Sequence, residues 1–263
     1  MPELPSETTT RPSEPLEPTI GRRLFFVWCA LWAGLMTVIS AVGSITHQAI
    51  SRDIGVFRRW SRFWARSMFF GIGFSVRPIL RTRLDPDQVY VFAANHQVAL
   101  DIPAASLAIP TPFGWVAKGE LAGTPVLGRA IKASPSVFLD KSSPRRSVES
   151  MRLAGARIRD GLSVIIFPEG ARSYEQKLQP FKRGAFMLAV EAGVPVVPVT
   201  ILNAYRHFDE KRKLAQPGTI EVAIGEPVSM EGVTRKQIPE IMETVRLAMQ
   251  REIDEWNRRS SLP

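Results

Sequence analysis

The stretch VYVFAANHQVALDIPAA (residues 89–105) contains an apolar run, a polar turn and the beginning of a helix in close succession. The apolar run is typical of a buried strand, and Pro103 is acceptable in the first turn of a helix but unfavourable in its middle. His96, one of three histidines in the chain, stands where the strand stops. Ligands of α/β proteins bind at this edge of the sheet, so the turn is a candidate functional site.

Asp101 follows His96 by five residues. On a continuous helix this offset is about 500°, so the two side chains can meet only if His96 lies in the turn and Asp101 opens the helix. Asp101 would then accept a hydrogen bond from one imidazole nitrogen and leave the other for a substrate, as in a general base held by a carboxylate. Two simpler interpretations remain open: Asp101 is only an N-cap, or His96 is only a polar strand end.

From about residue 74, short β-rich runs alternate with helical segments. Apolar runs such as VYVFAAN, LSVIIF and VPVVPVTIL are separated by helical segments at about residues 102–109, 144–160 and 184–192, before a terminal helix at about 234–257. This alternation predicts an α/β fold with a largely parallel sheet flanked by helices. No repeat or internal boundary divides the chain here, so we expect one α/β domain over residues 74–263.

The first 73 residues differ in composition from the rest. Residues 1–20 are rich in Pro, Glu, Ser and Thr and are expected to be a disordered tail. The apolar run LFFVWCALWAGLMTVISAVGSI that follows is 22 residues long, enough to cross a bilayer as a helix. A cleaved signal peptide is the competing interpretation, but its apolar part would be shorter and would not follow twenty acidic, proline-rich residues.

A second helix is expected directly after this run. Phe57, Trp60, Trp64 and Met68 form one apolar stripe, and an arginine stripe lies beside it at positions 58, 62 and 66. Tryptophan and arginine on an amphipathic helix suit the headgroup layer of a membrane. We therefore predict a membrane-anchoring helix pair over residues 21–73. Whether its first helix spans the bilayer or dips into one leaflet stays open, and the second helix could instead pack on its own domain.

The composition excludes several classes of protein. The net charge of +9 favours an anionic partner, and because the arginines cluster with tryptophans beside an apolar run we expect membrane lipids rather than nucleic acid. The chain has no GxGxxG, GxxxxGK[ST] or GxSxG motif. Its single cysteine, Cys29, cannot form an intrachain disulfide, and no Cys/His cluster has the spacing of a zinc site, so we expect no metal.

A second candidate constellation lies in IIFPEGARSYEQKLQPFKRGAF (residues 165–186). A strand ends in the turn Pro168-Glu169-Gly170, Arg172 follows, and Lys182 precedes a helix. The planar guanidinium fork suits phosphate, and a helix N-terminus favours anions. Together with the basic turn at Lys141, these strand ends could hold an anionic group. Taken alone, each is also compatible with an ordinary turn or a solvated loop.

In combination, these motifs resemble the glycerolipid acyltransferase family, specifically the 1-acylglycerol-3-phosphate (lysophosphatidate) acyltransferases. Four blocks occur in the family's order over about residues 75–225: NHQVALD (95–101), FLDK (138–141), FPEGARS (167–173) with FKRG (181–184), and VPVVPV (194–199). The stretch KGELAGTPVLG from Lys118 is similar to the family's segment between the first two blocks. Four ordered blocks are a specific match.

The resemblance implies an enzyme that transfers a fatty acyl group from acyl-ACP or acyl-CoA to the sn-2 hydroxyl of lysophosphatidate, giving phosphatidic acid without a cofactor. His96 would be the general base and Asp101 its partner. The acceptor would be bound by Lys141, Glu169, Gly170, Arg172 and Lys182. It further implies a bacterial inner membrane, with the active site facing the cytoplasm.

Three positions depart from the family pattern. Val98 replaces a common serine, Lys141 an arginine and Ala171 a threonine. Lysine keeps the charge of arginine but loses its bidentate fork. An acyltransferase of the same fold that uses a different lyso-lipid or alcohol acceptor is therefore the alternative. A non-catalytic lipid-binding protein is disfavoured, because His96 and Asp101 are both present.

Overall fold

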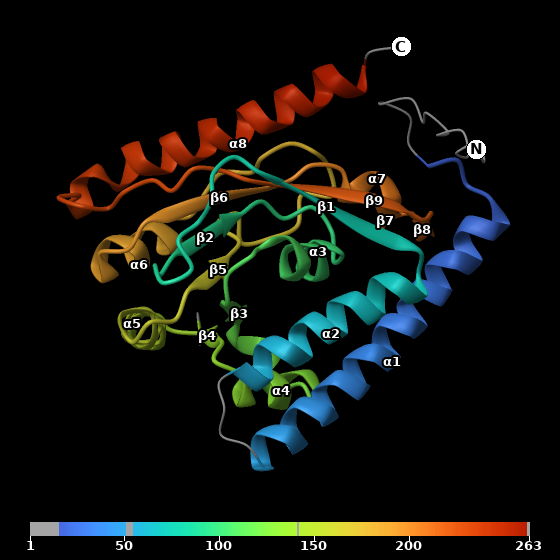
Figure 1. Cartoon of the computed structure of the whole chain (residues 1–263), viewed down its shortest axis with the longest axis horizontal. Coiled ribbons are helices and arrows are strands. Elements are labelled where there is room, and N and C mark those ends of the chain that lie inside the picture. The colour runs from blue at the N-terminus through green and yellow to red at the C-terminus, as the bar shows by residue number, and fades with distance from the viewer. Residues whose placement is uncertain (1–15, 51–54, 141, 262–263) are drawn as a thin grey trace.

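A computed structural model describes residues 16–50, 55–140 and 142–261 (Figure 1). Most of the predicted disordered tail and the predicted acceptor-binding residue Lys141 lie outside the described residues. The remaining candidate site residues, His96, Asp101, Glu169, Gly170, Arg172 and Lys182, are all described.

The core of the molecule is a seven-stranded sheet with the strand order β1-β9-β6-β2-β5-β3-β4. Its strands are β1 (Phe74–Leu80), β2 (Val91–Ala94), β3 (Gly114–Lys118), β4 (Val137–Leu139), β5 (Val164–Ile166), β6 (Val196–Ile201) and β9 (Gly218–Ile224). Neighbouring strands are parallel except where β9 pairs antiparallel with β6. The predicted α/β fold with a largely parallel sheet is thus confirmed.

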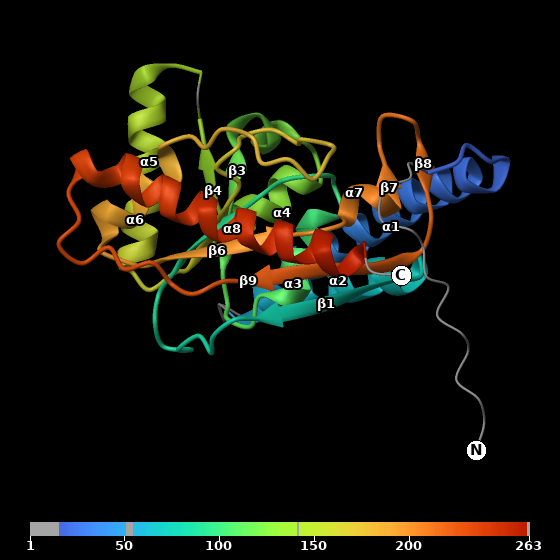
Figure 2. The same ribbon diagram turned by 90° about the horizontal axis from the view of Figure 1, so that it is seen from above.

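Helices cover both faces of this sheet (Figures 1 and 2). Strand β2 shows the division, because successive side chains of a strand point to opposite faces. Val91 and Ala93 pack in one apolar cluster, whereas Phe92 and Ala94 pack in another. The first cluster is covered by α5 (Pro144–Arg159), α6 (Gly184–Ala192) and α8 (Ile238–Ser260), and the second by α1 (Ile20–Ile50), α2 (Gly55–Gly71) and α3 (Asp101–Ala108).

Smaller elements connect these layers. They are the helices α4 (Leu127–Ala133) and α7 (Ala204–His207), the 3₁₀ turns η1 (Gly119–Gly123) and η2 (Arg235–Gln237), and a hairpin of β7 (Phe208–Asp209) and β8 (Leu214–Ala215). The hairpin follows β6 and packs beside α1. It places Glu210 against the turn that follows β2, where the sequence predicted a site.

Helices α1 and α2 form a hairpin of helices against one face of the domain (Figure 1). Indole N–H groups join the two helices: Trp28 and Trp32 donate to the carbonyls of Gly71 and Ser67, and Trp60 and Trp64 donate to His47 Nδ1 and Thr37 Oγ1. Glycine lets the helices approach, since a Cβ on Gly43 would lie 2.1 Å from the Trp60 ring. The predicted helix pair is therefore a tightly joined unit.

The predicted arginine stripe of α2 partly contacts the protein itself. Arg58 donates to the carbonyl of Pro110 at 3.1 Å, and Arg62 donates to that of Ile109 at 3.4 Å. These carbonyls follow the last turn of α3, where a positive charge is favourable. Arg58 and Arg62 therefore contact the domain itself, as the alternative in which α2 packs on its own domain requires.

Candidate active site

The turn after β2 is fastened to the neighbouring strand β6 by two buried amide side chains. Asn95 exchanges two hydrogen bonds with the backbone of Ile201, at 3.0 Å and 2.7 Å, and Gln97 donates to the same carbonyl at 2.9 Å. Asn95 therefore continues the hydrogen bonding of the sheet where β2 ends. This explains why an apolar strand ends in polar residues, and it fixes the backbone on both sides of His96.

His96 and Asp101 lie in contact in this turn. Nδ1 of His96 is 2.7 Å from Oδ2 of Asp101, which also accepts hydrogen bonds from the backbone N–H groups of Gln97 and Val98. Asp101 is the first residue of α3, but the N-cap position belongs to Leu100. The carboxylate thus folds back onto the turn, as the histidine–carboxylate interpretation requires, and is not simply a helix cap.

The Asp101 carboxyl group is fully buried. Burial raises its pKa, while the hydrogen bond from His96 and those from the two backbone N–H groups act in the opposite direction. The other oxygen, Oδ1, has no hydrogen-bond partner among the described residues. All three donors therefore converge on one oxygen, which fixes the direction of the imidazole ring.

The imidazole ring of His96 is also held from its face. It stacks on the ring of Phe167 with a centroid distance of 4.1 Å and an interplanar angle of 17°. Its side chain is 13% exposed, and within the described residues Nε2 makes no hydrogen bond. The ring is thus orientated through Nδ1, and Nε2 remains as the nitrogen that can exchange a proton with a ligand.

The FPEGARS segment is joined directly to the turn that carries His96. Backbone N–H groups of Ser173 and Tyr174 donate to the carbonyls of His96 and Gln97, at 2.8 Å and 3.1 Å. From the same segment, Glu169 accepts a hydrogen bond from the backbone N–H of His96 at 3.0 Å. The two motifs, about 70 residues apart in sequence, therefore form one site.

The Glu169 side chain is buried against the turn that carries His96. One carboxylate oxygen accepts from the N–H of His96, and the other accepts from the N–H of Gln179 at 3.2 Å. Burial raises the pKa of Glu169 to about 7. This placement gives Glu169 a structural role in joining two loops, and its predicted contact with an acceptor stays a prediction.

Gly170 makes room for the side chain of Lys182. Gly170 has a φ of 75°, in the region that favours glycine, and a Cβ there would lie 2.5 Å from Nζ of Lys182. The backbone N–H of Lys182 donates to the carbonyl of Pro168 at 2.8 Å. The structure therefore brings the predicted residues Gly170 and Lys182 together, with the ammonium group over the turn.

Replacing Gly170 with alanine should displace the Lys182 ammonium group and raise the KM for a phosphate-bearing acceptor roughly tenfold. Gly193 provides a matched control, because it has a φ of 66° but no neighbour within 4 Å of its added Cβ. Both variants should lose about 1–2 kcal/mol of stability from the left-handed backbone. Thermal unfolding and steady-state kinetics would separate the two effects, and an equal KM in both variants would contradict this role of Gly170.

Arg172 is paired with an acidic residue that the sequence reasoning missed. Its Nη1 lies 2.7 Å from Oε2 of Glu210, which follows β7. Glu210 belongs to no recognised block, and in HFDEKRK nothing distinguishes it from the adjacent Asp209. Only the folding of the β7–β8 hairpin over the site brings it to Arg172.

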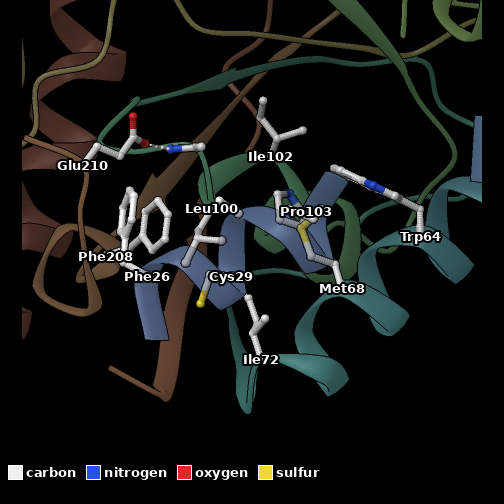
Figure 3. Close-up of a pocket in the computed structure, with 13 residues that line it drawn as sticks. Phe26, Cys29, Trp64, Met68, Ile72, Leu100, Ile102, Pro103, Phe208 and Glu210 are labelled. Atoms are coloured by element: carbon white, nitrogen blue, oxygen red, sulfur yellow. Dashed lines mark hydrogen bonds between the residues drawn. The ribbon is translucent and has the colours of Figure 1, made fainter. Parts of the chain in front are cut away.

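An apolar cavity of about 410 Å³ lies beside the turn, between α1, α2 and α3 (Figure 3). Phe26 and Cys29 line it from α1, Met68 from α2, Ile72 from just after α2, and Leu100 from the turn itself. Its volume is in the range of ligand pockets. Ala99 and Leu100, which lie between His96 and Asp101 in the turn, both line the cavity, so it can hold an apolar group against this turn.

No group of three His, Cys, Asp or Glu side chains in the described part of the chain could hold a metal ion. The carboxylates of the site are instead joined to a cationic side chain, to His96 or to the backbone. The arrangement can therefore place an anion near Arg172, an apolar chain in the cavity and a hydroxyl group at His96.

A family model described as "Acyltransferase" matches residues 78–202, which include all four sequence blocks. The chain is 31% identical over 234 residues to human 1-acyl-sn-glycerol-3-phosphate acyltransferase beta, an alignment that covers 86% of this chain and 82% of that protein. The chain belongs to the 1-acyl-sn-glycerol-3-phosphate acyltransferase family. The family resemblance seen in the sequence is thus confirmed.

Two further members of the family extend the comparison. The chain is 34% identical over 167 residues to mouse 1-acyl-sn-glycerol-3-phosphate acyltransferase alpha, and the match spans 58% of that protein's length. The fold matches the crystal structure of the 1-acyl-sn-glycerophosphate acyltransferase PlsC from Thermotoga maritima with a TM-score of 0.75 at 26% identity. That match covers 90% of this chain and 96% of the other.

Proposed function

We propose that the protein transfers a fatty acyl group from acyl-ACP or acyl-CoA to the sn-2 hydroxyl of 1-acylglycerol-3-phosphate and so forms phosphatidic acid. The observation that carries the proposal is the pairing of His96 with Asp101 at 2.7 Å, next to an arginine and an apolar cavity. Membership of the acyltransferase family supports the same reaction class.

In the proposed reaction, neutral His96 donates its Nδ1–H to Asp101 and accepts the proton of the acceptor hydroxyl at Nε2. The hydroxyl oxygen attacks the thioester carbonyl as the proton leaves, giving a tetrahedral intermediate. The carbon–sulfur bond then breaks, and the departing thiolate takes the proton back from the imidazolium. The buried Asp101 carboxylate stabilises the imidazolium between these two steps.

The proposed substrates fit the remaining features of the site. Arg172 and Lys182 supply positive charge for the acceptor's phosphate, and Lys141 is proposed to assist them. The apolar cavity beside Leu100 would hold a fatty acyl chain (Figure 3). A preformed apolar pocket favours a hydrocarbon chain over a polar group by the free energy of apolar burial.

Among the described residues, one helix is long and apolar enough to cross a bilayer, at Ile20–His47. Its outward face is apolar, with exposed side chains at positions that include Leu24, Val27, Leu31, Leu35 and Val38. Because its other face is joined to α2, we propose that the pair enters the lipid from one side and anchors the enzyme. We further propose that this lipid is the cytoplasmic face of a bacterial inner membrane.

Replacing both Leu31 and Leu35 with glutamate should lower partition onto lipid vesicles at least about tenfold, because each leucine loses apolar burial and each carboxylate opposes insertion. Leu247→Glu is the control, since Leu247 is 46% exposed on α8, on the other face of the sheet. Co-sedimentation with vesicles measures the effect. Equal partition of the double variant and wild type would contradict the proposed anchor.

Acyl transfer in detergent micelles tests the proposed function directly. Purified protein would be given lysophosphatidate with acyl-CoA or acyl-ACP, beside lysophospholipids with other headgroups. The alternative of another acceptor draws support from Ala171, which is exposed on the FPEGARS segment. Val98 gives it less support, because its side chain is buried in the core at 1% exposure. Activity confined to another headgroup would favour the alternative.

A further inference from the structure

The carboxylate of Glu210 joins two parts of the site that belong to different motifs. Its Oε2 accepts a hydrogen bond from Nη1 of Arg172 at 2.7 Å. Its Oε1 accepts one from the backbone N–H of Ala99, which lies in the turn between His96 and Asp101. The guanidinium proposed to bind phosphate is therefore connected to the turn that carries the imidazole.

Glu210 itself is held in place by the β7–β8 hairpin. Just before it, Phe208 stacks on Phe26 of α1 at a centroid distance of 4.8 Å. Just after it, the ammonium of Lys211 lies 4.7 Å from the centre of the Tyr174 ring, in the loop that also carries Arg172. The Glu210 side chain is 17% exposed, and its carboxylate stands at the edge of the cavity (Figure 3). It is a fixed group, unlike a solvated surface charge.

We infer that Glu210 is a positioning residue that sets the distance between Arg172 and His96, so that a phosphate bound to Arg172 brings the acceptor's hydroxyl to Nε2. This inference rests on the proposed function. An arginine has five N–H donors in a planar fork. Glu210 engages Nη1, and within the described residues the guanidinium makes no other hydrogen bond. The Nε–H and Nη2–H groups therefore remain for the phosphate.

The acceptor's own structure makes such a fixed distance useful. In 1-acylglycerol-3-phosphate, the phosphate and the free hydroxyl are carried by adjacent carbons, so their separation varies little. A guanidinium free to move among its rotamers would bind the phosphate at many distances from His96, and binding would cost the entropy of ordering it. Glu210 removes this freedom before the acceptor arrives.

Two other roles for Glu210 make different predictions. If the carboxylate competed with phosphate for Arg172, removing its charge would tighten acceptor binding. If it only stabilised the fold, its loss would affect all acceptors equally and would lower the unfolding temperature. A positioning role instead predicts weaker binding that is restricted to acceptors with a phosphate and depends on Arg172.

The decisive variant is Glu210→Gln. Its amide oxygen can still accept from the N–H of Ala99, but its NH₂ group no longer attracts the guanidinium. In detergent micelles, the Kd for lysophosphatidate should rise about tenfold, and kcat should fall about threefold or more, because part of the bound acceptor lies at unproductive distances from His96. Neither should change for 1-acylglycerol, which lacks the phosphate. Glu210→Asp, which keeps the charge on a shorter side chain, should recover part of the affinity. Glu226→Gln is the control, since Glu226 is exposed after β9.

The same measurements in an Arg172→Ala background complete the test. There, Glu210→Gln should cause no further loss, because residues that act through one contact are not additive. An unchanged or lower Kd in Glu210→Gln, or a loss that persists without Arg172, would overturn the inference. Wild-type protein that binds lysophosphatidate in this way but forms no phosphatidate would refute the proposed function alone. Absence of binding to wild type would refute both.

Discussion

Replacing His96 with alanine should lower the turnover of acyl transfer by about 10²–10⁴-fold, the usual contribution of a general base. The variant lacks the imidazole whose Nε2 is proposed to accept the hydroxyl proton, while the apolar cavity and Arg172 remain. The acceptor's KM should therefore change much less than kcat. Product formation from lysophosphatidate and a thioester donor, with both at saturation, measures the effect.

His47→Ala is a matched control for His96→Ala. His47 accepts a hydrogen bond from the indole of Trp60 at 3.3 Å, within the helix pair and away from the turn. The His47→Ala variant should retain most of the wild-type turnover. Because His96 also stacks on Phe167, the unfolding temperature of both variants must be measured beside the rates. Retention of more than about a tenth of the wild-type turnover by folded His96→Ala would exclude His96 as the general base.

Replacing Asp101 with asparagine should lower turnover about 10²-fold or more, although the geometry of the turn survives. The asparagine oxygen can take the place of Oδ2, where His96, Gln97 and Val98 all donate hydrogen bonds. In the opposite amide orientation, the NH₂ group would point at these three N–H donors, so that orientation is unfavourable. The imidazole thus keeps its orientation, and what is lost is the negative charge that stabilises the imidazolium.

Comparison with Asp101→Ala separates charge from structure. Asparagine should cost about 1–3 kcal/mol of stability, because its NH₂ group would occupy the buried position of Oδ1, which has no partner in the described part of the chain. Alanine should cost more, since it leaves two backbone N–H groups of the turn without an acceptor. Thermal unfolding and single-turnover rates are the measurements. Full turnover in Asp101→Asn would show that the carboxylate charge is unnecessary.

The segments predicted from periodicity agree closely with the helices of the structure. The helix predicted at residues 184–192 is α6 (Gly184–Ala192), and the one at 144–160 is α5 (Pro144–Arg159). The terminal helix begins later than predicted, because η2 occupies residues 235–237 behind a capping box at Thr234. Local signals suffice for such elements, since caps and apolar spacing lie within the segment itself.

Several features had no local signal. The antiparallel pairing of β9 with β6 depends on how distant strands meet, and the β7–β8 hairpin has only two residues in each strand. Helix α4 was also not predicted. The Asn95 side chain donates to one backbone group and accepts from another, and the Glu169 carboxylate accepts from two backbone N–H groups. These roles could not be read from the motifs, because a motif does not say which of its atoms face the protein.

The sequence by itself determined the α/β class and the apolar first helix, and it offered the contact between His96 and Asp101 as one of the open interpretations. These depend on residues close together in the chain, where the strand end, the turn and the helix start limit the positions of the side chains. Only the tertiary structure decided that Glu210 meets Arg172, that Glu169 accepts a hydrogen bond from the backbone of His96 and that α1, α2 and α3 line a cavity. Such contacts join residues far apart in the chain, as Ala99 and Glu210 are, at a separation of about 110 positions. Such separations are closed by the packing of whole elements, which no short pattern encodes.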